Sequence, residues 1–287
     1  METNNKYEDV LKKYNTALDE KTVKSILDKI AEKEKENSNK EVYKTIYSCI
    51  DLTSLNTTDT KESTFEMVDT VNGKDGAGEL PNVAAICVYP NFVETVRETL
   101  TANVKIASVA GGFPHAQTFT EVKVAECALC VLGGADEIDI VLNLGKYYDN
   151  SLEEVYEEID EMKGASQGRT LKVILETGAQ KSLEDIVKTS LLALYSGADF
   201  IKTSTGKVYQ GATPEAVYAM CHALKEYKEE TGNKAGIKIS GGVSTTADAV
   251  KYYTIVKEIL GEEYLNNEYF RIGASSLISA LEKSILE

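Results

Sequence analysis

The feature that most constrains this chain is a repeated alternation of short apolar strands with amphipathic helices from about Val42 to the end. The predicted strands lie at 45–51, 82–89, 104–110, 137–143, 170–176, 199–203, 236–240 and 269–273. The predicted helices that follow them lie at 62–72, 91–101, 118–132, 151–164, 182–196, 213–230, 245–260 and 275–286. Eight such units in roughly 245 residues predict an α/β fold of the (β/α)8 TIM barrel class.

An open, doubly wound parallel sheet is the competing architecture. Such sheets usually carry a glycine-rich turn after their first strand, and the segment 51–55 (Asp-Leu-Thr-Ser-Leu) has no glycine. The barrel is therefore the favoured fold for residues 42–287. Residues 1–41 are rich in Lys, Glu and Asn with a weak helical pattern, and we interpret them as extra N-terminal helices packed on the outside of the barrel.

The net charge of −15 restricts the partners. A protein this acidic repels nucleic acid and anionic membranes, so neither is expected as a partner. The chain has no apolar run of 18 residues, and its first residues, Met1 to Lys6, lack the apolar core of a signal peptide. We therefore expect a cytoplasmic protein that does not span a membrane.

Histidine and cysteine are too sparse or too scattered to suggest metal chemistry. Only two histidines are present, which disfavours zinc hydrolases and histidine-based triads. The five cysteines are an odd number in a cytosolic-looking chain, so free thiols are expected. Cys127 and Cys130 have the spacing of a redox or zinc pair, but they lie in an apolar helical pattern without a second pair. We interpret them as small buried residues.

Alternation along the strands predicts which side chains enter the barrel. In the fourth strand Ile138 and Ile140 face the helices, so Glu137 and Asp139 face inward. The same rule turns these further residues inward: Asp51, Cys87, Lys172, Glu176, Lys202, Lys238 and Ser240. Barrel interiors are normally apolar, and lysine is almost never buried without a partner. Three inward lysines with matching carboxylates favour a functional site over a purely structural ion-pair network.

The chemistry follows from these residue types. Desolvation and a neighbouring ammonium both disfavour the charged form of a buried lysine. A neutral amine attacks carbonyl carbons to form a Schiff base, and the protonated imine is an electron sink for carbon–carbon cleavage. A carboxylate nearby supplies general acid–base catalysis. The pattern therefore indicates an aldolase or related lyase that needs no metal and no organic cofactor.

A phosphate site is expected at the rim of the barrel. Glycines and serines follow the seventh and eighth strands, and a lysine follows the sixth, at Gly241-Gly242, Ser275-Ser276 and Lys207. Backbone N–H groups, hydroxyls and a helix N-terminus at these places form an anion cradle, as barrels commonly build one there.

The segment Phe200-Ile201-Lys202-Thr203-Ser204-Thr205-Gly206-Lys207 resembles the Schiff-base signature of the deoxyribose-phosphate aldolase family. The resemblance extends, in order, over roughly residues 42–280, through the segments 51–55, 85–90, 137–141, 172–177, 236–238, 241–243 and 273–276. It implies a class I aldolase of (β/α)8 fold. Such enzymes reversibly cleave 2-deoxy-D-ribose 5-phosphate to D-glyceraldehyde 3-phosphate and acetaldehyde, a step of deoxyribonucleotide catabolism.

The resemblance also implies residue roles. Lys202 is the imine-forming lysine, Lys238 its cationic neighbour, and Asp139 the acid–base residue that acts through a water. The substrate-binding residues implied are Asp51, Cys87, Lys172 (which also tunes Asp139) and Thr205, and the phosphate-binding residues are Gly206, Lys207, Gly241, Gly242, Ser275 and Ser276. A homodimer is expected from the resemblance alone.

The chain departs from the family pattern in three places. Ser244 stands where a basic residue commonly follows the Gly-Gly-Val turn, the C-terminal tyrosine of some members is absent, and the N-terminal extension is long. Two roles stay open: His115 contacts substrate or is merely exposed, and Glu176 relays protons or neutralises a lysine. The alternatives are another Schiff-base sugar-phosphate aldolase, such as a transaldolase-like enzyme, and a catalytically silent barrel that binds a phosphorylated ligand.

Overall fold

Eight parallel strands close into a barrel in the computed structural model, which describes residues 6–287. Each strand pairs with the next in the chain, and β8 pairs with β1. The strands are β1 (Ile50–Thr53), β2 (Ala85–Val88), β3 (Lys105–Val109), β4 (Glu137–Val141), β5 (Thr170–Ile174), β6 (Phe200–Lys202), β7 (Gly236–Ser240) and β8 (Phe270–Ala274). The predicted TIM barrel is thereby confirmed.

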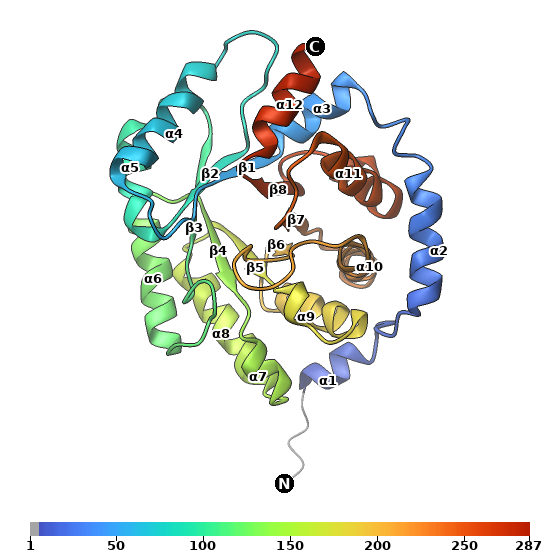
Figure 1. Cartoon of the computed structure of the whole chain (residues 1–287). Coiled ribbons are helices and arrows are strands. Elements are labelled where there is room, and N and C mark those ends of the chain that lie inside the picture. Colours follow the sequence, from blue (N-terminus) through green and yellow to red (C-terminus); the bar gives the residue numbers. More distant parts are fainter. Residues whose placement is uncertain (1–5) are drawn as a thin grey trace.

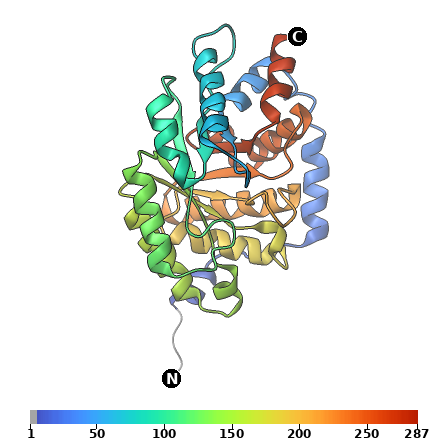
Figure 2. The same cartoon turned by 60° about the vertical axis from the view of Figure 1, so that its left-hand side comes forward.

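Helices surround the strands on all sides (Figures 1 and 2). Those that follow the strands are α4 (Lys61–Lys74), α5 (Val93–Thr99), α6 (Thr120–Leu132), α7 (Leu144–Tyr148), α8 (Leu152–Ala165), α9 (Leu183–Tyr195), α10 (Pro214–Thr231), α11 (Thr246–Leu260) and α12 (Leu277–Leu286). Three short 3-10 turns complete the set, η1 (Pro90–Phe92), η2 (Thr177–Ala179) and η3 (Glu262–Tyr264). The short helix α7 was not predicted, because it occupies only five residues between β4 and α8.

Helix α10 shows how the sequence sets these boundaries. The Thr213 hydroxyl accepts a hydrogen bond from the backbone N–H of Ala216, and Pro214 supplies the fixed φ that suits a first helical position. The helix ends at Gly232, whose φ of 74° is readily adopted by glycine. These are the start and stop signals used for the prediction, and the predicted range of 213–230 differs from the helix by one residue at each end.

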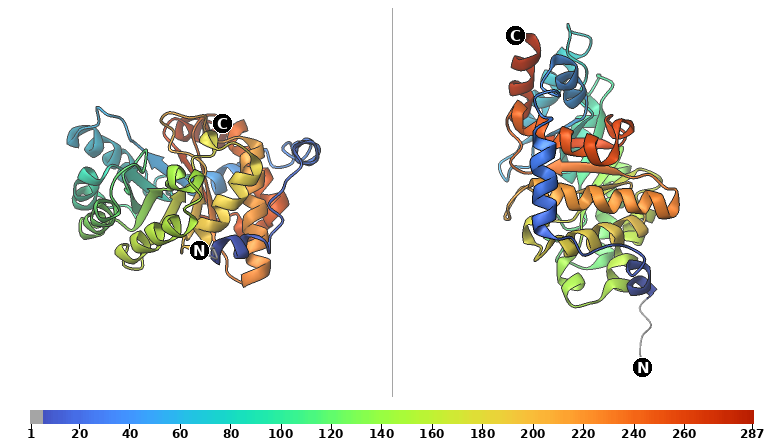
Figure 3. Two further views of the ribbon diagram at one scale, coloured as in Figure 1. Left: turned by 90° about the horizontal axis from the view of Figure 1, so that it is seen from below. Right: turned by 90° about the vertical axis from the view of Figure 1, so that its right-hand side faces the viewer.

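In the described part of the chain, three helices precede β1: α1 (Lys6–Leu11), α2 (Glu20–Ala31) and α3 (Lys40–Ser48). Helix α2 packs across α10 and α11 on the outside of the barrel, and α1 packs against α8 and α9 (Figure 3). The predicted domain boundary at residue 41 falls inside α3. The predicted strand 45–51 is wrong over residues 45–48, which form the last turn of α3, because an apolar run this short fits either element.

The strands bury both faces. Their outward residues, such as Ile86, Ile138 and Ile237, pack under the helices in the main hydrophobic core. Inward residues of β2 and β3, including Ala85 and Cys87, form a separate small cluster with Leu55. Within residues 6–287 no helix is long and apolar enough to cross a bilayer. Residues 1–5, on which the expectation of no signal peptide partly rests, lie outside the described part.

Candidate active site

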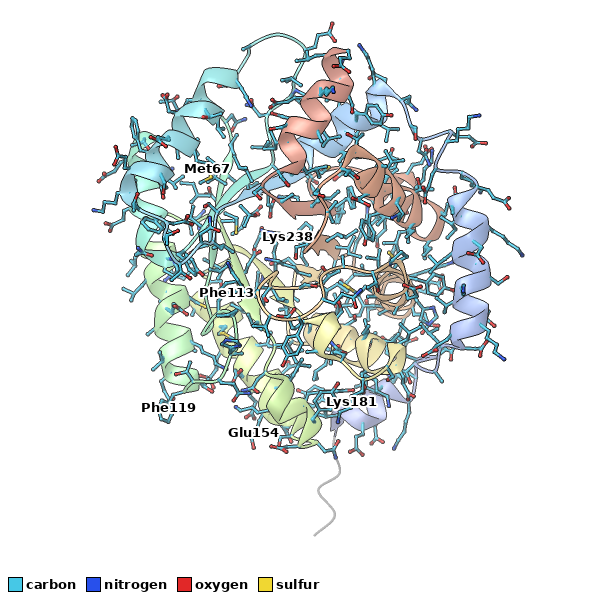
Figure 4. All side chains as sticks on the ribbon, viewed as in Figure 1. Met67, Phe113, Phe119, Glu154, Lys181 and Lys238 are labelled. Atoms are coloured by element: carbon cyan, nitrogen blue, oxygen red, sulfur yellow. The ribbon has the colours of Figure 1, made fainter. Side chains whose placement is uncertain are left out.

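The barrel interior holds a dense cluster of buried charges, which we call the interior network. It consists of four cations, Lys172, Lys202, Lys238 and Arg271, and three carboxylates, Asp51, Glu137 and Asp139. All seven residues are at most 3 % exposed. They come from β1, β4, β5, β6, β7 and β8, so closure of the barrel brings them together. Figure 4 shows Lys238 near the middle of the molecule, in contrast to Phe119 at its margin.

Asp139 lies at the centre of this network. Its Oδ2 atom accepts hydrogen bonds from Nζ of Lys202 and Nζ of Lys238, each at 2.8 Å, and its Oδ1 atom accepts one from Nζ of Lys172 at 2.9 Å. Burial alone would raise the pKa of Asp139, but the three ammonium groups outweigh burial and hold that pKa well below its usual value. Asp139 is therefore a carboxylate that binds all three lysines at once.

The three lysines differ in how fully their charges are balanced. Lys172 contacts three carboxylates, with Glu137 at 2.6 Å, Asp139 at 2.9 Å and Asp51 at 3.2 Å. Lys238 contacts two, Asp51 and Asp139. Among the carboxylates of residues 6–287, Lys202 contacts only Asp139, and it shares the accepting oxygen with Lys238. Lys202 is thus the least compensated lysine of the network.

The pKa values follow this order. Burial lowers the pKa of Lys202, Asp139 opposes that effect, and the neighbouring Lys238 lowers it further, so that the net pKa lies below the ordinary value. Burial acts against charge in Lys238 as well, but Asp139 and Asp51 outweigh it and raise the pKa of Lys238. Lys238 therefore stays an ammonium, while Lys202 is the amine disposed to lose its proton.

A cleft of about 240 Å³ opens beside Lys202 at the carboxyl end of the barrel, and we call it the rim cleft. It is lined by Lys202, Thr53, Leu55, Asn56, Thr205, Gly206, Lys207, Ser240, Gly241, Gly242, Val243, Ser244, Gly273, Ala274, Ser275 and Ser276. Among these lining residues two are cationic, Lys202 and Lys207, and none is acidic. In a chain of net charge −15, such a cleft is a local site for an anion.

Backbone contacts hold the rim cleft in shape. A side chain on Gly211 would meet the carbonyl oxygen of Gly241 at 2.2 Å, so the loop after β6 lies directly on the loop after β7. The Glu176 carboxylate fixes the same loop by accepting bonds from the backbone N–H and the hydroxyl of Thr205, at 3.2 and 2.5 Å. Lys207 donates its ammonium hydrogen bond to the carbonyl of Leu55 across the cleft.

Comparison with known proteins identifies the family of this chain. The model of the DeoC/LacD family aldolase matches residues 45–277. The chain belongs to this aldolase family. A deoxyribose-phosphate aldolase of Bos taurus is 37 % identical over 250 residues, which cover 83 % of this chain and 79 % of the bovine protein. The deoxyribose-phosphate aldolase of Homo sapiens is 42 % identical over 205 residues, 70 % of this chain and 64 % of the human one.

Solved structures of aldolases share the fold. A protein described as QR15, an aldolase, superposes with a TM-score of 0.68 at 30 % identity and covers 83 % of this chain and 95 % of its own. The tetrameric deoxyribose phosphate aldolase of Aeropyrum pernix superposes with a TM-score of 0.69 at 26 % identity, covering 88 % and 96 %. The resemblance found in the sequence is thereby confirmed at the level of the aldolase family.

The predicted site residues fall into two groups. Lys202, Thr205 and all six predicted phosphate residues line the rim cleft, whereas these five lie inside the barrel without lining it: Asp51, Cys87, Asp139, Lys172 and Lys238. Cys87 is fully buried, and burial raises the pKa of its thiol. The roles of all these residues stay predictions.

Arg271 was missed by the sequence analysis. It is 1 % exposed, and its guanidinium binds Asp51 at 2.6 Å and Glu137 at 2.8 and 3.1 Å. The signal was present, because Phe270 and Ile272 face the helices and alternation then turns Arg271 inward. Glu137 was predicted to face inward but was given no role.

The remaining candidates take simpler places. His115 is exposed in the loop after β3, and Glu176 contacts Thr205 rather than a lysine of the interior network. All five cysteines are free and buried, Cys127 and Cys130 included, as predicted. Within residues 6–287 no group of three or more His, Cys, Asp or Glu residues is placed to hold a metal ion.

Proposed function

We propose that this aldolase cleaves 2-deoxy-D-ribose 5-phosphate reversibly to D-glyceraldehyde 3-phosphate and acetaldehyde through a Schiff base on Lys202. The observation that carries the proposal is the position of Lys202. It is the least compensated lysine of the interior network and the only member of that network that also lines the rim cleft. The aldolase relatives named for this substrate support the same substrate class.

The first step is imine formation. The neutral amine of Lys202 attacks the aldehyde carbon C1 of the open-chain sugar, and the carbinolamine loses water to give the protonated imine. Lys238 keeps its ammonium charge beside the reacting nitrogen, which favours the neutral amine before the attack.

The second step is cleavage of the C2–C3 bond. A base removes the proton of the C3 hydroxyl, the C2–C3 electron pair moves toward the iminium, and glyceraldehyde 3-phosphate leaves an enamine on Lys202. We assign the base to a water held by Asp139, whose carboxylate is kept ionised by its three lysine partners. Protonation of the enamine at C2 and hydrolysis of the imine then release acetaldehyde and the free amine.

In the proposed complex, the phosphate group of the substrate binds in the rim cleft. Gly206, Gly241 and Gly242 all have positive φ, so that the backbone of both loops turns sharply at the cleft. The exposed Ser275 and Ser276 precede α12, whose N-terminus favours an anion. The phosphate thus binds at the rim while the aldehyde end reaches inward to Lys202.

Borohydride trapping tests the proposal. Protein mixed with acetaldehyde and sodium borohydride should acquire one N-ethyl group, a net addition of C2H4, and peptide mapping should locate that group on Lys202. A silent phosphate-binding barrel would give no adduct. Trapping with dihydroxyacetone but not with acetaldehyde would indicate a different Schiff-base aldolase.

A further inference from the structure

The amino end of the interior network contains an ion pair that the proposed reaction does not use. Arg271 of β8 binds Glu137 of β4 through two nitrogens, and also binds Asp51 of β1. Its Nε donates to the backbone carbonyl of Asn267. Each nitrogen of this guanidinium therefore has a protein acceptor, and four of its five N–H donors are engaged.

We propose that the Arg271–Glu137 pair is a positioning device that sets the charge balance of the interior network and so leaves Lys202 as the amine that loses its proton. The inference rests on the proposed function, because it assigns to these residues a task in imine formation. Neither residue lines the rim cleft, so both act through other members of the network.

The network contains four cations and only three carboxylates, so with every group ionised it carries one excess positive charge on side chains that are almost fully buried. Burying an uncompensated charge is costly, and the cost falls when one lysine becomes neutral. Arginine does not deprotonate in proteins, so Arg271 cannot be the group that gives up its proton.

The geometry then selects the lysine. Arg271 binds Oδ1 of Asp51 and both oxygens of Glu137. Lys172 shares Oε2 of Glu137 with Arg271, and Lys172 and Lys238 share Oδ2 of Asp51. Lys202 is left with a single oxygen of Asp139 that Lys238 also uses. Loss of a proton from Lys202 therefore gives up less ion pairing than loss from either other lysine.

Charged and titratable groups from most strands of the barrel surround Lys202. They are Asp51 of β1, Cys87 of β2, Glu137 and Asp139 of β4, Lys172 of β5, Lys238 of β7 and Arg271 of β8, with Glu176 and Lys207 in loops at the carboxyl end. Arg271 is the one arginine among these groups, so its charge is permanent. A unit charge about 10 Å from an amine changes its pKa by about one unit when the effective dielectric constant is about 20.

Substitution of Arg271 and substitution of Glu137 should move the pH profile of cleavage in opposite directions. Arg271→Met removes a positive charge, so Lys202 holds its proton to higher pH, and the midpoint of the acidic limb of kcat/KM for cleavage should rise by about one pH unit. Glu137→Gln removes a negative charge with little change of shape, and the same midpoint should fall by about one pH unit. The double variant Arg271→Met/Glu137→Gln restores the balance, and its midpoint should return close to that of the unaltered enzyme.

Lys105 provides a matched control. Its Nζ lies 3.3 Å from Glu137, but its side chain is 52 % exposed in a cleft of about 460 Å³ at the amino end of the barrel. Water screens this charge, so Lys105→Met should move the midpoint by less than about 0.3 pH unit. Arg271 and Glu137 border the same cleft, so added guanidinium ion should reach the space left in Arg271→Ala and lower its midpoint again.

Folded single variants with the midpoint of the unaltered enzyme would overturn the proposal, as would midpoints that move in the same direction for Arg271→Met and Glu137→Gln. If Arg271→Met does not fold, the isosteric Glu137→Gln decides alone, because a purely structural role predicts no fall of its midpoint. Failure of the proposed function is distinguishable: unaltered enzyme would then trap no ethyl group on Lys202, whatever the variants do.

Discussion

Two regions of this molecule bury lysines beside carboxylates, and only one of them has the form of an active site. The interior network holds Lys202 against Asp139 at 2.8 Å. Outside the barrel, between α6 and α8, Lys123 is fully buried and binds Glu158 at 2.6 Å, and Lys146 of α7 binds the same carboxylate at 3.0 Å. In each region one carboxylate binds more than one lysine.

The direction in which the lysine pKa moves does not separate the two regions. Burial lowers the pKa of Lys123, Glu158 opposes this, and Lys146 lowers it further, which is the same combination of causes as at Lys202. What differs is access. Lys202 lines a cleft with a second lysine and no acid, while Lys123 is sealed between helices with 0 % of its side chain exposed. A lowered lysine pKa indicates a reactive amine only where a substrate can reach it.

The strongest test of this difference is to make one substitution in both regions. Lys202→Leu should abolish cleavage, a fall of at least about 10⁴-fold, because no other amine in the network lines the cleft. Lys123→Leu should keep cleavage within about twofold. Steady-state cleavage assays on both variants provide the measurement.

For stability, the larger effect should come from Lys123→Leu and the smaller one from Lys202→Leu. Lys123→Leu leaves Glu158 with Lys146 as its remaining ion-pair partner, so we expect a loss of about 1–3 kcal/mol in the free energy of unfolding, measured by urea denaturation.

Cleavage retained by Lys202→Leu would refute the assignment of the imine to Lys202. Cleavage lost in a folded Lys123→Leu variant would show that the outer cluster matters to the chemistry.

A smaller effect is expected at Lys238. Its ammonium, which shares Oδ2 of Asp139 with Lys202, lowers the pKa of Lys202. Lys238→Met removes that repulsion, so the pKa of Lys202 rises and a smaller fraction of the amine is neutral at pH 7. The neutral fraction falls about tenfold for each pH unit by which this pKa rises, and we expect a loss of activity of about 10- to 100-fold at pH 7.

The pH profile distinguishes this explanation from a general loss of structure. In Lys238→Met the acidic limb of kcat/KM should move to higher pH, and activity should partly recover as the pH is raised. An unmoved limb would mean that burial alone lowers the pKa of Lys202.

Sequence reasoning reached much of the barrel because its signals are local. Strand alternation assigned Glu137, Asp139, Lys172 and Lys238 to the interior, and each is fully buried there. Helix ends followed cap residues such as Thr213 and Gly232. The start of β1 was misplaced because residues 45–48 fit either a strand or the end of a helix, and only packing of α3 against α11 and α12 decides between them.

The connectivity of the site was beyond sequence. Alternation shows that Lys202 and Lys238 point inward, but not that they share one oxygen of Asp139, since that depends on the stagger of β4, β6 and β7 around a closed barrel. The clamp of Glu176 on Thr205 also joins loops that are 29 residues apart in the chain. The charge excess of the network became visible only when Arg271 was counted.

The smallest effect on activity is expected at the rim cleft, whose lining residues determine the selectivity for a phosphorylated substrate. Lys207 lines the cleft with its ammonium held by the Leu55 carbonyl, so it offers a partly screened charge to a phosphate. Lys207→Met should raise KM for the phosphorylated sugar by about fivefold, equivalent to about 1 kcal/mol, and leave KM for unphosphorylated 2-deoxyribose unchanged. Ser244→Lys, which adds a cation to the same cleft, should lower KM for the phosphorylated sugar only. Equal changes of KM for both sugars would show that the phosphate binds elsewhere. The comparison of the accessible Lys202 with the sealed Lys123 would then explain imine formation only, and not the selectivity for a phosphorylated substrate.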